Sequence, residues 1–287
     1  MKSTKPLDRG ALKSHPLPSV VNGDKETKGR ILIIAGSREV PGAALLSAMA
    51  AMRAGAGKLS IATVESVVPQ LGMAMPEAMV IGLPENGEGG FAASAVKRIT
   101  EDAAKADAVA AGPGMSSGPV CKQIADALLR TDAHLAFDAA LLHNLQPCSK
   151  RRLPSLPVLL PHAGELASLL DCAEDEIEID PVRCGLRAAH LYGSVVLVKG
   201  VTSHVVTPDG EAWTYEGGAP GLGVSGSGDV LAGIVGGLLA RGAEPLSALL
   251  WSVWLHGEAG AKLANKVGTI GFLARQIADE IPVLLPR

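Results

Sequence analysis

The segment at residues 221–229 reads Gly-Leu-Gly-Val-Ser-Gly-Ser-Gly-Asp and leads directly into an apolar stretch of helical composition. The first N–H groups of a helix lack an intrahelical partner and carry partial positive charge. The amides of Gly226, Ser227 and Gly228 could therefore stabilise a phosphate or a phosphoryl group in transfer. Asp229 would lie beside that anion, where its carboxylate could accept a proton from an attacking hydroxyl. The alternative is structural, because an aspartate after a flexible turn also caps helices.

Part of this segment also matches the dinucleotide-binding pattern Gly-x-Gly-x-x-Gly, with Gly221, Gly223 and Gly226 at its fixed positions. In dinucleotide-binding folds the pattern follows the first strand of a βαβ unit directly. Here it lies late in the chain, and residues 217–220 separate it from the nearest expected strand. We therefore do not expect a dinucleotide-dependent dehydrogenase.

Two further segments place polar side chains directly after expected strands. His162 and Glu165 follow the apolar run 158–160, and Lys199 follows the apolar run 195–198. Ligands of open α/β sheets bind at the carboxyl ends of strands. Glu165 could hold Mg²⁺ through water, His162 could bind a polar substrate, and Lys199 could neutralise a phosphate. The alternatives are a helix-capping segment with Glu165 in the first turn and a solvated loop lysine.

Glycine-rich corners follow earlier strands as well, at residues 35–37, 42–43 and 112–114. Each corner alone is a weak turn signal, but in a parallel sheet all of them would line the same edge. The remaining histidines lack the spacing of zinc ligands, and no nucleophile elbow of an α/β-hydrolase is present. The sequence thus favours phosphate chemistry over zinc or triad hydrolysis.

The elements that must position these residues alternate between short apolar strands and helices. The expected strands are 31–35, 59–64, 78–81, 108–111, 135–137, 158–160 and 195–198, and the expected helices are 42–53, 92–104, 120–129, 229–240 and 245–265. Such strands are typical of βαβ units around a mainly parallel sheet with helices on both faces. A hairpin is expected at 204–215, around the turn Pro208-Asp209-Gly210. We expect an N-terminal arm at 1–28 and one α/β domain at 29–287.

The composition excludes several classes of protein. Of 287 residues 47% are hydrophobic, and the formal net charge is -3, which favours a large core and excludes disorder as the main state. A nucleic-acid-binding protein would need a basic excess, and the few aromatic residues offer no platform for stacking bases. No apolar run could span a membrane, no signal-peptide core is present, and the four cysteines suit a reducing compartment. We expect a cytoplasmic protein that binds neither nucleic acid nor membranes.

Taken in order, these segments resemble the ADP-dependent NAD(P)H-hydrate dehydratases of the ribokinase-like superfamily. The matching segments are 35–63, 110–115, 159–170, 196–210, 221–242 and 256–282. Gly-Ser-Gly-Asp at 226–229 marks only the superfamily. Pro-His-Ala-Gly-Glu at 161–165, with Lys199-Gly200 and the early glycine segment from residue 36, narrows the resemblance to the dehydratases. The resemblance implies a ribokinase-like three-layer fold.

The resemblance also implies a reaction, the repair of the S-form of hydrated NADH or NADPH. ADP would phosphorylate the ring hydroxyl, and elimination of phosphate would restore NAD(P)H and leave AMP and phosphate. The implied substrate contacts are Ala43, Gly114, His162 and Asp229. The implied contacts to ADP are Lys199, Gly200, Val201, Thr202, Ser203 and Gly228. Mg²⁺ would bridge the phosphates of ADP, with Glu165 as its contact through water.

Two features depart from the family pattern. Asp138 is retained, but Ala140 stands where relatives carry the second carboxylate of an Asp-Ala-Asp motif. The segment before residue 29 is too short for the epimerase domain fused in other family members, so we expect a separate NAD(P)H-hydrate epimerase as a functional partner. The family resemblance predicts a homotetramer, for which the apolar segment 243–255 could supply an interface.

Two other functions remain open at this point. A ribokinase-like kinase for a vitamin-precursor or sugar alcohol would use the same Gly-Ser-Gly-Asp motif, so this motif alone does not separate it from the dehydratase. A non-catalytic nucleotide-binding protein is the third alternative, supported only by the carboxylate lost at Ala140.

Overall fold

The computed structural model describes residues 4–19, 25, 27–143, 145–147 and 154–286, whose strands form one mixed 10-stranded sheet. The strands are β1 (Lys5–Pro6), β2 (Arg30–Ile34), β3 (Lys58–Val64), β4 (Ala78–Leu83), β5 (Ala108–Ala111), β6 (His134–Phe137), β7 (Val158–Leu159), β8 (Val195–Val198), β9 (Ser203–Val206) and β10 (Ala212–Tyr215). Their order across the sheet is β1-β10-β9-β8-β7-β6-β5-β2-β3-β4. Strands β2 to β8 pair in parallel, whereas β9 runs antiparallel to β8 and β10.

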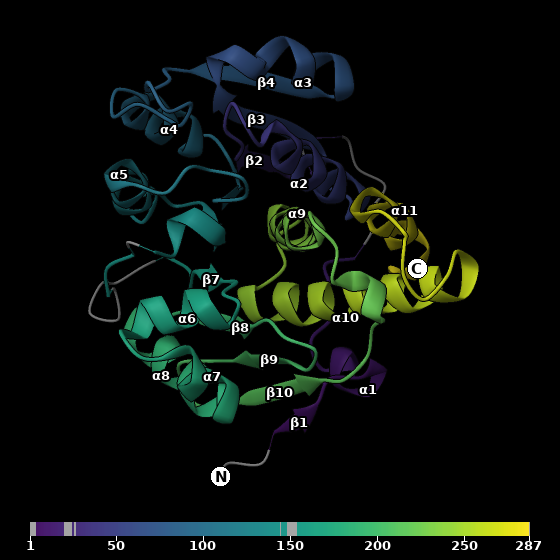
Figure 1. The fold of residues 1–287 in the computed structure, drawn as a ribbon. Helices are drawn as coiled ribbons and strands as arrows, with labels where there is room; N and C mark the ends of the chain where they lie inside the picture. The colour runs from purple at the N-terminus through teal and green to yellow at the C-terminus, as the bar shows by residue number, and fades with distance from the viewer. Residues whose placement is uncertain (1–3, 20–24, 26, 144, 148–153, 287) are drawn as a thin grey trace.

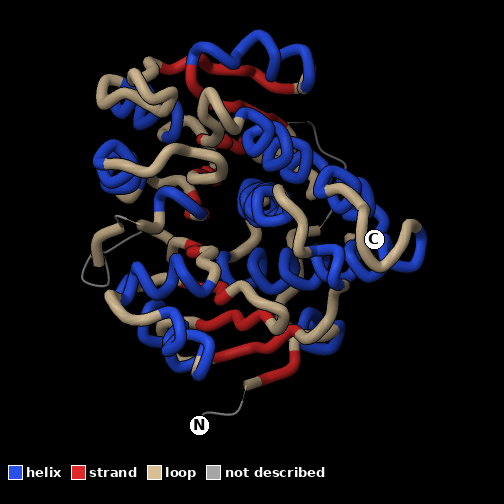
Figure 2. Tube along the Cα trace, viewed as in Figure 1, coloured by secondary structure: helices blue, strands red, loops and turns tan. Residues whose placement is uncertain are grey.

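Helices cover both faces of this sheet, which confirms the predicted α/β class (Figure 1). The helices are α1 (Arg9–Lys13), α2 (Pro41–Arg53), α3 (Val68–Ala74), α4 (Ala95–Ala103), α5 (Pro119–Leu128), α6 (Ala163–Leu170), α7 (Glu174–Ile179), α8 (Pro181–Tyr192), α9 (Ser227–Ala240), α10 (Pro245–Lys266) and α11 (Ala274–Leu284). Helices α2, α9, α10 and α11 form one layer, and α4, α5, α6 and α8 form the other; Figure 2 shows the red strands between the blue helices. Among the described residues, no helix combines the length and apolar character that crossing a membrane requires.

Helix α9 lies at the centre of its layer and is buried along nearly its whole length. Its glycines let it approach α2 and the sheet closely. A Cβ added at Gly233 would lie 2.2 Å from the Ser47 carbonyl oxygen of α2, and one added at Gly236 would lie 2.9 Å from Ala110 Cβ of β5. Because the interior is close-packed, this contact fixes where the helix begins and where its first N–H groups point.

The parallel strands deliver the chemistry-bearing residues to one edge of the sheet. Asp138 directly follows β6, His162 follows β7 and Lys199 follows β8. His162 and Lys199 also pair across neighbouring strands in an isolated parallel bridge. Because parallel strands all end at the same edge, the loops after them converge near the start of α9 (Figure 1).

The fold differs from the sequence prediction in the N-terminal arm and in several helices that were not predicted. The expected arm at 1–28 contributes β1, which pairs with β10, and α1, which packs against α10. Residues 1–3, 20–24 and 26 of that arm, and Cys148, lie outside the described residues. The sequence analysis did not predict α1, α3, α7, α8 and α11, and it gave the start of α6 only as the helix-capping alternative for His162 and Glu165.

Candidate active site

The first turn of α9 forms the centre of the candidate site. Gly226 adopts a left-handed conformation with φ of 89°, which places the chain for the helix start at Ser227. A Cβ at Gly226 would lie only 2.4 Å from Leu46 Cδ1, so a larger residue would need both a strained backbone and a displaced neighbour. The predicted glycine-rich entry to a helix is therefore confirmed as local structure.

The Ser227 N–H, one of the three expected anion donors, makes a hydrogen bond within the chain. The Ser227 N–H donates a hydrogen bond of 3.1 Å to the Val224 carbonyl oxygen, which closes the turn before the helix. This bond engages the Ser227 N–H in the turn, and the expectation that all three amides stabilise an anion stays a prediction. The first-turn position of Gly228 still suits its N–H to meet an anion at the helix N-terminus.

Asp229 lies in the first turn of α9, and its side chain has a raised pKa. Burial, and then the negative charge of Asp138, raise the pKa of Asp229 from 3.8 to about 6, although Lys199 opposes this shift. The Ser47 hydroxyl of α2 donates to the Asp229 carbonyl oxygen at 2.9 Å, which anchors the residue. A carboxylate with a pKa near 6 is mostly ionised at neutral pH, yet it is basic enough to accept a proton from a reacting hydroxyl.

Beside Asp229, one lysine joins two buried carboxylates. Lys199 Nζ lies 2.7 Å from Asp138 Oδ1 and 3.7 Å from Glu165 Oε2. Burial alone would lower the pKa of Lys199, but the charges of Asp138 and Glu165 raise it, so the ammonium group keeps its proton. A Cβ at Gly228 would lie 3.9 Å from Lys199 Nζ, which places this cation directly at the helix N-terminus.

Asp138, the retained carboxylate of the family's Asp-Ala-Asp motif, lies beside Lys199, although the sequence analysis gave it no role in the site. Its carboxylate is almost fully buried and also accepts a hydrogen bond of 2.9 Å from the Ala139 N–H. The signal for it was its place directly after the strand expected at 135–137, as for His162 and Lys199. With Lys199 and Asp229 it forms a chain of alternating charges along the edge of the sheet.

His162 and Glu165 form a capping box at the start of α6, which is the helix-capping role that the sequence left open for them. The His162 Nδ1 atom accepts hydrogen bonds from the N–H groups of Gly164 and Glu165, at 3.1 and 3.4 Å. Glu165 Oε2 accepts from the His162 N–H at 2.8 Å. Capping does not exclude binding, because the His162 side chain stays exposed and the buried Glu165 is held near Lys199.

The other predicted contacts lie in two groups. Gly200, Val201 and Thr202 lie in the loop from β8 to β9, in which Val201 is fully exposed, and Ser203 is the first residue of β9. Ala43 and Gly114 lie side by side at the start of α2, since a Cβ at Gly114 would be 2.5 Å from Ala43 Cβ. Gly114 has a φ of 63°, so its turn favours glycine.

Few of the described side chains could bind Mg²⁺ directly. Among the described residues, no group of three or more His, Cys, Asp or Glu side chains is arranged to hold a metal ion. Glu165 already receives the His162 N–H and lies near Lys199, which leaves it room for a contact through water rather than a direct bond. These residues therefore fit an ion held mainly by the phosphates of a nucleotide.

His256 of α10 reaches the same helix start and was missed by sequence reasoning. Its Nε2 atom lies 3.1 Å from both the Ser227 hydroxyl and the Ser227 carbonyl oxygen. Burial lowers the pKa of His256 from 6.5 to about 4, so the imidazole is neutral at physiological pH. No spacing rule could have found a contact between residues 29 positions apart in sequence.

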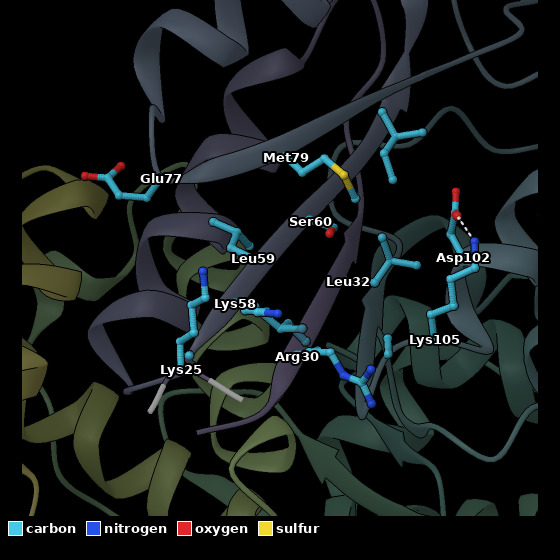
Figure 3. Close-up of a pocket in the computed structure, with 14 residues that line it drawn as sticks. Lys25, Arg30, Leu32, Lys58, Leu59, Ser60, Glu77, Met79, Asp102 and Lys105 are labelled. Carbon is cyan, nitrogen blue, oxygen red and sulfur yellow. Dashed lines mark hydrogen bonds and ion pairs between the residues drawn. The ribbon is translucent and has the colours of Figure 1, made fainter. Parts of the chain in front are cut away.

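A separate cavity of about 470 Å³ lies at the opposite end of the strands (Figure 3). It is lined by the first residues of β2 and β3, including Arg30 and Lys58, by Met79 of β4, by Asp102 of α4 and by Lys105, which follows α4. Arg30 is paired with Asp107, and Lys105 with Asp102. None of the predicted site residues lines it.

Known proteins of similar sequence identify the family of this chain. A model of the family described as NAD(P)H-hydrate dehydratase matches residues 31–283. The ADP-dependent (S)-NAD(P)H-hydrate dehydratase of Xanthomonas campestris is 46% identical over 279 residues, which are 96% of this chain and 94% of that protein. The bifunctional NAD(P)H-hydrate repair enzyme of Moorella thermoacetica is 34% identical over 92% of this chain, which spans 50% of that longer protein.

Solved structures extend the agreement to three dimensions. The ADP/ATP-dependent NAD(P)H-hydrate dehydratase of Bacillus subtilis, co-crystallised with ATP/Mg²⁺, has a TM-score of 0.86 and 26% identity, and the match covers 99% of this chain and 98% of that one. Arabidopsis thaliana ribokinase, at 12% identity and a TM-score of 0.54, shares the fold over 88% of this chain and 97% of its own. The predicted ribokinase-like fold is thus confirmed, and the chain belongs to the NAD(P)H-hydrate dehydratase family.

Proposed function

We propose that this protein is an ADP-dependent hydro-lyase that dehydrates the S-form of hydrated NADH or NADPH. The observation that carries the proposal is Asp229, a carboxylate with a pKa of about 6 at the start of a buried helix, beside the charged Lys199. This arrangement combines a base for a hydroxyl with positive charge for a phosphoryl group. The dehydratase of Xanthomonas campestris, 46% identical over nearly the whole chain, supports the choice of substrate.

In the first step, Asp229 accepts the proton of the ring hydroxyl while that oxygen attacks the β-phosphorus of ADP. The bond from the β-phosphorus to the bridging oxygen breaks, and AMP leaves with that oxygen and its electron pair. Negative charge that develops on the transferring group is stabilised by the Gly228 N–H and by Lys199, which are preorganised at the helix N-terminus.

In the second step, the phosphate leaves the ring carbon with the electron pair of its C–O bond. Loss of a proton from the neighbouring ring carbon restores the double bond, so the products are NAD(P)H, AMP and phosphate. Phosphorylation is useful here because phosphate is a far better leaving group than hydroxide. The nucleotide is therefore an activating reagent, consumed once in each turnover.

The remaining contacts that we propose are those that the family resemblance implies. ADP would lie along Lys199–Ser203 and Gly228, and the hydrated ring would lie near Ala43, Gly114 and His162. Mg²⁺, when bound to the phosphates, would offset their charge. Glu165 would orient the ion through a water molecule, since one of its oxygens already accepts a backbone N–H.

The cellular setting is part of the proposal. We infer a cytoplasmic homotetramer that requires Mg²⁺ and works beside a separate NAD(P)H-hydrate epimerase. The epimerase would supply the S-form from the other epimer, because a dehydratase specific for one epimer leaves the second unrepaired. Sedimentation of the purified protein measures the assembly, and removal of Mg²⁺ by a chelator should abolish turnover.

The experiment that tests the function is direct. The purified protein is incubated with hydrated NADH, Mg²⁺ and either ADP or ATP, and the absorbance of the restored dihydropyridine is followed. Recovery that depends on nucleotide and yields AMP and phosphate in equal amounts from ADP is the expected result. A stable phosphorylated alcohol with no recovery of NADH would instead identify a kinase, and nucleotide binding without any chemistry would identify a non-catalytic protein.

A further inference from the structure

The contact between α10 and the first turn of α9 has a defined polarity. His256 Nε2 lies 3.1 Å from the Ser227 carbonyl oxygen, and a carbonyl oxygen can only accept a hydrogen bond. The proton of the neutral imidazole therefore lies on Nε2. The Ser227 hydroxyl oxygen, also 3.1 Å from Nε2, can then only accept from that same N–H.

This polarity leaves the proton of the Ser227 hydroxyl free of His256. The amide of Ser227 is already engaged with the Val224 carbonyl oxygen, so the hydroxyl is the group through which Ser227 can meet an anion. The side chain is nearly buried and sits in the first turn of α9, between Gly226 and Gly228. An O–H donor at this place would add to the amide donor of Gly228.

We propose that His256 is a positioning residue, which fixes the Ser227 hydroxyl so that its proton points at the phosphoryl group in transfer. The inference rests on the proposed phosphoryl-transfer function. A second side chain, Ser47 of α2, donates to the Asp229 carbonyl oxygen in the same turn. The helix start is thus held from two sides, by α2 near the base and by α10 near the hydroxyl.

Variants at both residues test the coupling. Ser227→Ala should lower kcat by about 10²-fold, the usual effect of removing one donor to a developing anion. His256→Leu should lower kcat by roughly 10- to 100-fold, the range for partners that orient a catalytic group. His256→Gln, whose amide can donate to the same oxygen atoms, should recover most of that loss. The KM for hydrated NADH should change little in all three variants.

The double variant separates positioning from general damage. If His256 acts through Ser227, His256→Leu should have almost no further effect on kcat in the Ser227→Ala background. An equal loss of kcat in both backgrounds would overturn the inference, as would an unchanged kcat in His256→Leu alone. Ser252→Ala is the matched control, because it removes a buried hydroxyl from the same helix, bonded at 2.6 Å to the Ala248 carbonyl oxygen.

A spectroscopic measurement does not depend on activity. The ¹⁵N shifts of the histidine side chains distinguish the two neutral tautomers, and the His256 signals are assigned by their loss in His256→Gln. The expected result is the Nε2–H tautomer in the wild-type protein at neutral pH; the Nδ1–H tautomer would refute the proposed polarity. An inactive wild type would contradict the proposed function, whereas an active wild type with an insensitive His256→Leu contradicts only this inference.

Discussion

Replacing Asp229 by asparagine should abolish turnover and at the same time stabilise the fold. The pKa of Asp229 is raised from 3.8 to about 6, so the native state holds this proton more tightly than the unfolded chain does. Stability therefore falls as the pH rises through this window and is lowest above it. A shift of about two pKa units corresponds to about 3 kcal/mol at neutral pH. Asp229→Asn removes the charge, so its free energy of unfolding should increase by up to about 3 kcal/mol.

Urea denaturation at several pH values measures this effect. The gain in the free energy of unfolding should be largest above pH 6 and should disappear only below about pH 4, where the wild-type carboxyl is protonated in the unfolded state as well as in the native state. Asp209→Asn is a matched control in the exposed turn of the hairpin, and it should change stability by less than about 0.5 kcal/mol. A less stable Asp229→Asn protein, or a gain that does not depend on pH, would refute the reasoning.

Three further outcomes follow from the same geometry. In the wild type, kcat/KM should fall about tenfold for each pH unit below an apparent pKa of about 6, as Asp229 becomes protonated; a flat profile between pH 5 and 7 would exclude it as the base. Lys199→Met should raise the KM for ADP and move that acid limb to higher pH, because the lysine holds down the pKa of Asp229; a move to lower pH would contradict the assigned cause. Gly233→Ala should lower the free energy of unfolding by about 1–3 kcal/mol, because its Cβ would lie 2.2 Å from a carbonyl oxygen of α2, while Gly42→Ala, which meets nothing within 4 Å, should be nearly neutral in the same denaturation assay.

Local patterns predicted the elements that carry the site. The apolar runs 108–111 and 195–198 are β5 and β8 with the same bounds, and the segment at 221–229 does lead into a buried helix. These features are predictable because strand periodicity, turn residues and helix starts depend on neighbours in the sequence. The same local rules gave both interpretations of the segment at 161–165, and the capping box shows that its structural role is real.

The charge network could not be predicted in the same way. The pairing of Asp138 with Lys199 depends on β7 lying between β6 and β8, and the strand order is a property of the whole sheet. The contact of His256 with Ser227 depends on how α10 crosses α9, which no pattern within either helix encodes. The raised pKa of Asp229 also depends on the whole fold, because it arises from the burial of this carboxyl group and from the charge of Asp138 on another loop.

The placement of β1 has a consequence for the order in which the protein folds. Lys5 pairs with Trp213 in the sheet, and its ammonium group lies 4.9 Å from the centre of that indole ring and 2.6 Å from Glu211. During synthesis the residues of β1 emerge long before those of β10, so β1 cannot pair in the sheet until β10 has been made. Closing a loop of this length is slow compared with forming the βαβ units. We therefore expect β1, although it precedes β10 in the sequence, to pair with β10 late in folding.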